Sequence, residues 1–92
     1  MARKSRMIKA GGMDLGSTRT GESVRIRQVY GGHHFLSRLA SLGFTPGVRL
    51  RVVQNFGHGP IIVDLRDTRI ALGRGEASRI QIERLAGGKD GA

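Results

Sequence analysis

The chain has 92 residues, which is room for one small domain, and its formal net charge is +9 with the histidines neutral. It contains no cysteine, which excludes disulfide frameworks, thiolate metal sites and thiol nucleophiles. The excess of positive charge indicates an acidic partner, such as nucleic acid, an anionic membrane surface or an acidic protein. No apolar run is long enough for a signal peptide or a membrane span, so we expect a cytoplasmic protein.

The composition divides the chain into three regions. Residues 1–12 hold four cations and no acidic residue, and residues 86–92 are mostly glycine and alanine. Neither end has the apolar periodicity of a packed element, so both are predicted to be disordered tails, the first of them basic. The folded domain is expected over residues 13–85.

The first predicted strand covers residues 24–27, where apolar residues alternate with arginine. A short helix follows, because Leu36, Leu39 and Leu42 recur at a spacing of three with Phe35 beside them. Such a short helix is marginal in water and needs to lay its apolar stripe on the rest of the fold. We therefore expect all three leucines in the core.

The helix is predicted to end at Gly43, which suits the left-handed position after a helix. Phe44 then lies where this cap places an apolar contact to Leu39. Pro46–Gly47 fits the two central positions of a type II turn, because proline presets the first φ and glycine accepts a positive second one. A strand can begin directly afterwards, at Val48.

The same alternation of apolar and polar residues predicts the remaining strands, with a polar turn at Asp67–Thr68. These strands are expected at residues 48–52, 61–66, 70–72 and 80–83. Five short strands joined by brief turns predict a mainly β fold, a small and strongly bent antiparallel barrel.

Several short motifs occur together in one order. They are Leu39-x-x-Leu42-Gly43-x-x-Pro46-Gly47, Gly59-Pro60-Ile61, Ile70-Ala71-Leu72 and Glu76-Ala77-x-x-Ile80. In this order the chain resembles the FeoA family, the small cytosolic component of bacterial ferrous iron uptake, over residues 13–84. It also resembles the SH3-like domains at the C-terminus of iron- and manganese-dependent repressors. The resemblance implies a five-stranded SH3-like barrel with one short helix inserted after the first strand and a single helical turn, containing Ala77, before the last.

Three histidines raise the question of a metal site, because imidazole is a ligand for ferrous iron. His33 and His34 are adjacent at the expected helix start, where successive side chains point in different directions, so they cannot chelate one ion together. His58 lies between two glycines in a turn. We predict no metal site within the chain and no tightly bound cofactor, and leave open a weak or intermolecular contact with Fe²⁺.

No catalytic constellation is recognisable in the sequence. The seven carboxylates are scattered, and Gly73-Arg74-Gly75 lacks the further glycine or the Lys-Ser/Thr pair that phosphate-binding loops need. No serine or threonine belongs to a recognisable nucleophile motif. The chain is therefore predicted not to be an enzyme.

The outward arginines of two strands are the strongest candidates for a binding surface. Arg25 and Arg27 on one strand and Arg49 and Arg51 on the next could form one basic stripe, or simply a solvated sheet face. The chain has only four aromatic residues, two of them assigned to packing, so base stacking is poorly provided for. A nucleic-acid partner is therefore disfavoured but left open.

We predict a non-enzymatic accessory protein of ferrous iron uptake. By resemblance, it docks on the cytoplasmic GTP-binding part of the ferrous iron permease. The docking surface is predicted on the helix, the turn after it and the next strand, at Arg38, Ser41, Thr45, Pro46, Arg49 and Arg51. Two alternatives remain: a nucleic-acid-binding small barrel and a free-standing metal-sensing domain.

Overall fold

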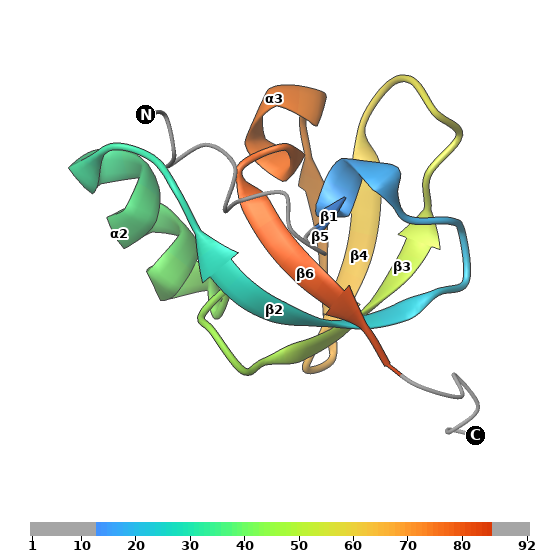
Figure 1. The fold of residues 1–92 in the computed structure, drawn as a ribbon, viewed down its shortest axis with the longest axis horizontal. Coiled ribbons are helices and arrows are strands. Elements are labelled where there is room, and N and C mark those ends of the chain that lie inside the picture. The colour runs from blue at the N-terminus through green and yellow to red at the C-terminus, as the bar shows by residue number, and fades with distance from the viewer. Residues whose placement is uncertain (1–12, 86–92) are drawn as a thin grey trace, which may run out of the picture.

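The computed structural model describes residues 13–85, which form a six-stranded sheet, two α-helices and a 3-10 turn (Figure 1). In chain order the elements are β1 (Met13–Asp14), η1 (Leu15–Ser17), β2 (Ser23–Val29), α2 (His33–Leu42), β3 (Arg49–Gln54), β4 (Ile61–Leu65), β5 (Thr68–Leu72), α3 (Arg74–Ala77) and β6 (Ile80–Arg84). The predicted tails, residues 1–12 and 86–92, lie outside the described residues.

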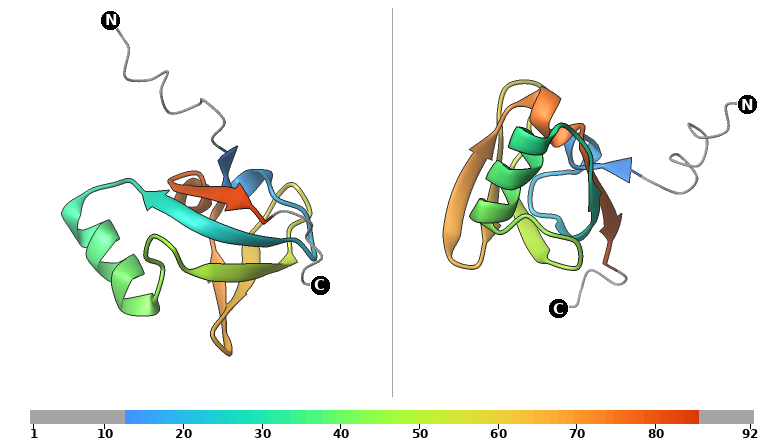
Figure 2. Two further views of the ribbon diagram at one scale, coloured as in Figure 1. Left: turned by 60° about the horizontal axis from the view of Figure 1, so that its bottom comes forward. Right: turned by 90° about the vertical axis from the view of Figure 1, so that its left-hand side faces the viewer.

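All strand pairs are antiparallel, in the order β1-β6-β2-β3-β4-β5. The sheet bends strongly, so that β2 and β6 cross over β4 and β5 (Figure 2). The prediction of a mainly β fold is confirmed, but six strands are present rather than five. The additional strand is β1, whose Met13 pairs with Ile82 and whose Asp14 pairs with Gln81.

The hairpin between β4 and β5 differs from its predicted form by one residue. Leu65 pairs with Thr68, so the turn consists of Arg66 and Asp67, and Thr68 already belongs to β5. Both turn residues have positive φ, 50° for Arg66 and 69° for Asp67. Positive φ at both positions matches the right-handed twist of a tight hairpin, a backbone that usually takes Asn or Gly and that Arg66 and Asp67 adopt here.

The hydrophobic core lies inside the bend of the sheet and is built from the apolar half of each alternating strand. Inward-facing residues of β2, β3, β4 and β6 are almost completely buried, whereas their sequence neighbours face outward. The largest of the core side chains are Leu15, Ile26, Leu39, Phe44, Ile61, Leu65, Leu72, Ile80 and Ile82. This alternation is what orients the charged residues of the outer face.

The predicted end of α2 is confirmed in detail. Gly43 has a φ of 100°, its N–H donates to the Ala40 carbonyl at 3.0 Å, and the Phe44 N–H donates to the Leu39 carbonyl at 2.9 Å. These two bonds are the pair that defines a Schellman cap. The type II turn follows, with a φ of 93° at Gly47 and a 3.1 Å bond from the Val48 N–H to the Thr45 carbonyl.

The prediction that three leucines of α2 enter the core is wrong for two of them. Leu39 is fully buried, but Leu36 is 37% exposed and Leu42 is 40% exposed. Leu36 and Leu42 each lie three residues from Leu39, on opposite margins of the helical stripe. The helix touches the sheet along a narrow line through Leu39, so the margins stay in solvent.

The expected helical turn, α3, is present and contains Ala77, whose side chain is buried. Glu76 accepts a hydrogen bond from the Gly73 N–H at 3.0 Å, which caps the start of the turn. The same carboxylate forms an ion pair with Arg38 of α2. The two helices are thus joined by a charged contact as well as through the core.

A polar cluster closes the other end of the bent sheet, and sequence analysis did not find it. The Asn55 side-chain amide donates to the Thr18 carbonyl at 2.6 Å, and its oxygen accepts from Arg74 at 3.0 Å. Arg74 also donates to the Gly16 carbonyl at 2.9 Å. We call Gly16, Thr18, Asn55 and Arg74 the Asn55 hub, because Asn55 joins η1, α3 and the loop after β3.

Candidate functional site

The outer face of β2 and β3 carries the predicted arginines. In the register of these strands Arg25 lies opposite Arg49, and Ser23 lies opposite Arg51. Residues 13–85 contain eleven arginines, no lysine and six acidic residues, which leaves this part of the chain with a formal charge of 11 − 6 = +5. Guanidinium groups bind carboxylates and phosphates in a bidentate way that ammonium groups cannot match.

Some arginines of the sheet surface are neutralised by ion pairs, and others are not. Arg25 pairs with Glu83 of β6 at 3.2 Å, and Arg69 holds both oxygens of Asp64 at 2.8 and 3.1 Å. Arg49 and Arg51 take part in none of the four ion pairs found within residues 13–85.

Asp64 lies opposite Arg51 across β3 and β4, but its charge is already engaged. The hydrogen bond from Arg69, followed by the charges of Arg69 and Arg51, holds the pKa of Asp64 below its ordinary value of 3.8, although desolvation acts in the other direction. Arg51 attracts Asp64 through its charge but forms no ion pair within residues 13–85, so its guanidinium N–H groups are available to an acidic partner.

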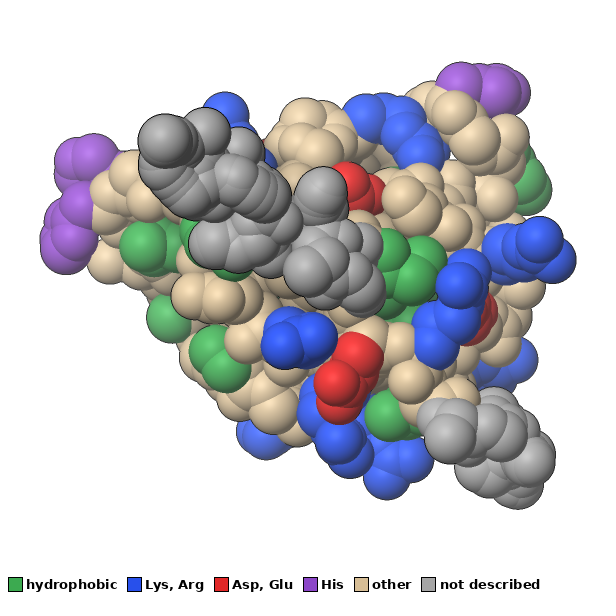
Figure 3. Space-filling model, viewed as in Figure 1, with side chains coloured by type: hydrophobic (Ala, Val, Ile, Leu, Met, Phe, Trp, Pro, Cys, Tyr) green, Lys and Arg blue, Asp and Glu red, His purple; other side chains and the backbone are tan. Residues whose placement is uncertain are grey.

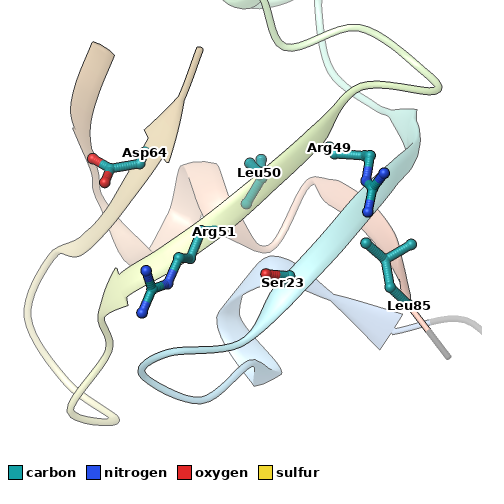
Figure 4. Close-up of a pocket in the computed structure, with 6 residues that line it drawn as sticks. All are labelled: Ser23, Arg49, Leu50, Arg51, Asp64 and Leu85. Atoms are coloured by element: carbon teal, nitrogen blue, oxygen red, sulfur yellow. The ribbon is translucent and has the colours of Figure 1, made fainter. Parts of the chain in front are cut away.

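These free arginines lie around a shallow hollow of about 240 Å³, which we call the basic hollow. Its lining residues are Ser23, Arg49, Leu50, Arg51, Asp64 and Leu85. Figure 4 shows Arg49 reaching across β2 toward Leu85, with Ser23 lying between Arg49 and Arg51. Because serine is small, it leaves space beside Arg51 for an incoming group.

The chemistry of the hollow suits an acidic side chain that is followed by an apolar one. Two guanidinium groups and the Ser23 hydroxyl can bind a carboxylate, while Leu85 offers an apolar wall. On the face shown in Figure 3, blue side chains gather over the lower and right-hand parts, whereas the end that carries α2 shows few of them. On this face the positive charge therefore lies mainly away from α2.

The other predicted docking residues are distributed around the turn and the helix. The side chain of Arg38 is committed to Glu76 of α3, and the Ser41 hydroxyl donates to the Ser37 carbonyl of its own helix at 2.9 Å. Pro46 is exposed and Thr45 half-buried in the turn that leads directly into β3. The turn thus adjoins the strand of Arg49 and Arg51, whereas Arg38 faces another element.

Arg27 does not continue the row of arginines. The pairing of β2 with β6 shifts between Ile26 and Gln28, which makes Arg27 the extra residue of a β-bulge. Its side chain is exposed, and Arg25 is neutralised by Glu83. Of the predicted stripe of four arginines, the structure leaves Arg49 and Arg51 as the pair that lines the basic hollow.

Of the six lining residues, the sequence pointed to Arg49 and Arg51 and missed Ser23, Leu50, Asp64 and Leu85. Ser23 lies two residues before Arg25 in β2, so its side chain is on the same outward face, and the alternation of β2 could have identified it. Leu85 follows the last strand, and no local signal indicates that it lies against Arg49. Its position depends on the pairing of β6 with β2.

The histidines do not come together. His33 and His34 begin α2 and are exposed, as predicted, and their ring centres are 6.0 Å apart. His58 lies in the loop between β3 and β4, and Figure 3 shows histidine side chains at two separate ends of the molecule. No group of three potential metal ligands occurs among residues 13–85. Weak or intermolecular contact with Fe²⁺ stays a prediction.

Neither α-helix in the described part of the chain is long and apolar enough to cross a lipid bilayer. This agrees with the sequence, in which apolar residues are distributed over short alternating strands.

Comparison with known proteins identifies the family. The family model described as "FeoA domain" matches residues 13–84. A protein of Methanocaldococcus jannaschii named "Putative Fe(2+) transport protein A" is 35% identical over 69 residues, which cover 75% of this chain and 83% of that protein.

Solved structures agree with this match. A crystal structure of an iron uptake regulatory protein, FeoA, aligns with a TM-score of 0.75 and 31% identity, covering 80% of this chain and 99% of the other. FeoA of Stenotrophomonas maltophilia, crystallised with zinc and described as a prokaryotic SH3 domain protein, aligns with a TM-score of 0.69 and 29% identity, covering 77% and 89%.

The predicted relation to metal-dependent repressors is also confirmed. A manganese-dependent transcriptional repressor aligns with a TM-score of 0.73 and 25% identity, covering 80% of this chain but 42% of the repressor. The fold is thus SH3-like, and the family model covers nearly all of the described residues. The chain belongs to the FeoA family, which is involved in ferrous iron transport.

Proposed function

We propose that the protein is a non-enzymatic accessory factor of ferrous iron uptake that docks on the cytoplasmic GTP-binding part of the ferrous iron permease. Membership of the FeoA family supports the link to iron transport. The basic hollow supports docking, because Arg49 and Arg51 lie unpaired on an exposed strand face beside an apolar wall. The partner would contribute an acidic residue to the hollow.

The turn before β3 extends this docking surface. Pro46 is exposed and lies three residues before Arg49, and its backbone is fixed by the hydrogen bond from Val48 to Thr45. A rigid turn loses little conformational entropy on binding, so its contacts add to affinity at a small entropic cost. Arg38 and Ser41 of α2 would form the margin of the surface.

The test is binding of the permease in detergent by this protein and by the variant Arg49→Glu/Arg51→Glu. Reversal of two charges that face an acidic partner should weaken binding at least about tenfold and reduce its dependence on salt. Arg19→Glu/Arg66→Glu is the matched control, because both residues are exposed, lie outside the hollow and change the net charge equally, from +9 to +5.

Equal loss of binding in both variants would show that net charge, not the hollow, determines docking. Unchanged binding in the Arg49/Arg51 variant, with the fold intact by circular dichroism, would exclude the hollow. Restoration of ferrous iron uptake in cells that lack the protein, by the parent but not by this variant, connects docking with transport.

A nucleic-acid partner remains the second candidate because of the charge of +5 in residues 13–85. The lining of the hollow includes no aromatic side chain on which a base could stack. Binding of RNA or DNA by counterion release alone would show a steep dependence on salt. Loss of that binding in the Arg49→Glu/Arg51→Glu variant but not in its control would favour this candidate over the permease.

A further inference from the structure

Strand β5 is an uncovered edge of the sheet. It ends the strand order and pairs with β4 alone. In the right-hand view of Figure 2, β5 forms the left-hand outline of the molecule, and no other described element lies beyond it. Thr68, Arg69 and Ala71 of this strand are exposed. An open edge can accept another strand through its unpaired backbone groups.

The register of the hairpin identifies those backbone groups. A two-residue turn is flanked by a hydrogen-bonded pair, here Leu65 and Thr68. Pairs alternate along an antiparallel ladder, so Arg69 and Ala71 direct their N–H and C=O groups away from β4. The free edge therefore offers two donors and two acceptors.

The usual protections of an edge strand are missing from β5. Its five pairs with β4 run without a bulge, whereas both the β2–β6 and β3–β4 pairings are interrupted. The strand contains neither proline nor lysine. Its one charged residue is Arg69, which the carboxylate of Asp64 already neutralises on the same sheet.

We propose that β5 pairs with β5 of a second copy of this chain, antiparallel and about a two-fold axis at Ile70. In this register Arg69 lies opposite Ala71 of the second copy, and the two pairs form four backbone hydrogen bonds. The half-buried Ile70, which packs against the core, lies opposite Ile70 of the second copy on the inner face. The small Ala71 leaves room for the Arg69 side chain.

Charge distinguishes a second copy from an acidic strand of another protein. An acidic strand would gain little at β5, because the one cation of the strand is held by Asp64 with two hydrogen bonds. The inner-face residue Ile70 is half-buried and instead suits an apolar neighbour, which β5 of a second copy supplies with its own Ile70. Self-pairing therefore provides partners for the free backbone groups and an apolar neighbour for the inner face, and it requires no opposite charge.

This dimer goes beyond the proposed docking function and does not depend on it. In a continuous sheet the outer faces of both copies coincide, because Arg69 and Ala71 are both outward-facing residues. The two basic hollows would then lie on one face, so a partner with two acidic segments could bind both. Because the contact involves one five-residue strand, the dimer should be weak and concentration-dependent.

Disulfide trapping tests the register directly, because the chain has no cysteine of its own. In the proposed register, position 70 of one copy faces position 70 of the other in a non-hydrogen-bonded pair. In such pairs the two Cβ atoms lie at the close end of the cross-strand range, about 4.5 Å apart, which a disulfide can bridge. Ile70→Cys should therefore form a covalent dimer on mild oxidation. Ala71→Cys is the matched control, because that position faces residue 69 and its Cα is beyond the roughly 7 Å limit from its own copy.

Position 71 is exposed and position 70 is half-buried, so random collisions would cross-link Ala71→Cys at least as fast. We expect at least tenfold more covalent dimer from Ile70→Cys, and equal yields would overturn the proposal. Adding Ala71→Pro to the Ile70→Cys variant removes the Ala71 N–H, which faces the free edge, and leaves the hydrogen bonds to β4 intact. This change should suppress the dimer, whereas adding Ala71→Val should not. A cross-link that survives Ala71→Pro in a folded protein would also contradict the register.

Discussion

The two ends of the bent sheet are closed in different ways. At one end α2 lies on the sheet through Leu39 and Phe44, and backbone hydrogen bonds fix its end at Gly43. At the other end the Asn55 hub joins three segments by side-chain hydrogen bonds, two of them to backbone carbonyls and one between Arg74 and the Asn55 side chain. The first closure uses burial and local geometry, whereas the second uses polar groups that come from distant parts of the chain.

The difference shows that a small domain can be closed by either kind of contact. Apolar burial is non-directional, so α2 tolerates two exposed leucines at its margins. A polar group shielded from water needs a partner in a defined position, and the hub residues are half-buried or, for Thr18, buried, so they depend on one another. The variants described next change one end at a time.

The largest effect is expected at the buried contact of α2. Leu39→Ala removes a fully buried side chain and should lower the free energy of unfolding by about 2–5 kcal/mol. Leu36→Ala and Leu42→Ala, at exposed margins of the same helix, should each cost about 0.5 kcal/mol or less. Urea denaturation measures all three, and similar losses would mean that the helix is held along its whole stripe.

The hub should be the next most sensitive region. Asn55→Ala removes the Asn55 donor from the Thr18 carbonyl and one of the hydrogen bonds of Arg74, which keeps its bond to Gly16. This loss should cost about 1–3 kcal/mol of unfolding free energy. His58→Ala is the control, because His58 is an exposed residue of the same loop. Hydrogen exchange should show faster opening of the loop after β3 in the Asn55 variant, while α2 keeps its protection.

Two glycines near the end of α2 separate backbone strain from steric contact. Gly43 and Gly47 both have positive φ, but a Cβ at Gly43 would meet Leu65 at 2.8 Å, whereas one at Gly47 meets nothing within 4 Å. Alanine at either position is destabilised by the left-handed backbone. Gly43→Ala should lower the free energy of unfolding by about 1 kcal/mol more than Gly47→Ala, because its Cβ also meets Leu65. Equal losses in thermal denaturation would mean that Leu65 moves aside freely.

The smallest effect concerns pH and the loop next to the hub. Burial raises the pKa of Glu22, but hydrogen bonds from the Arg84 side chain and the Arg19 N–H outweigh it and hold the pKa below 4.5. A carboxyl with a lowered pKa stabilises the fold above pH 4.5, and this stabilisation disappears as the pH falls below that value.

In the Glu22→Gln variant the melting temperature should therefore fall less between about pH 5 and pH 3 than it does in the parent protein. Asp67→Asn serves as the control, since Asp67 is in none of the four ion pairs of residues 13–85. If the melting temperature of the Glu22 variant fell with pH as steeply as that of the parent, Glu22 would not contribute to the pH dependence of stability.

Much of the fold could be predicted because its signals are local. Strand alternation, the glycine cap and the proline turn depend on neighbours within a few residues, and the structure confirms them at Gly43, Phe44 and Gly47. The same alternation indicated that Arg49 and Arg51 face outward. Their role in docking stays a prediction.

The contacts between distant segments were decided by the tertiary structure alone. Which arginines are neutralised depends on register, which places Glu83 beside Arg25 and Arg69 beside Asp64. The exposure of Leu36, the place of Leu85 in the basic hollow and the Asn55 hub depend on how the sheet bends. The physical reason is range: backbone geometry and side-chain alternation act over a few residues, whereas ion pairs, burial and buried polar bonds exist only once distant segments meet.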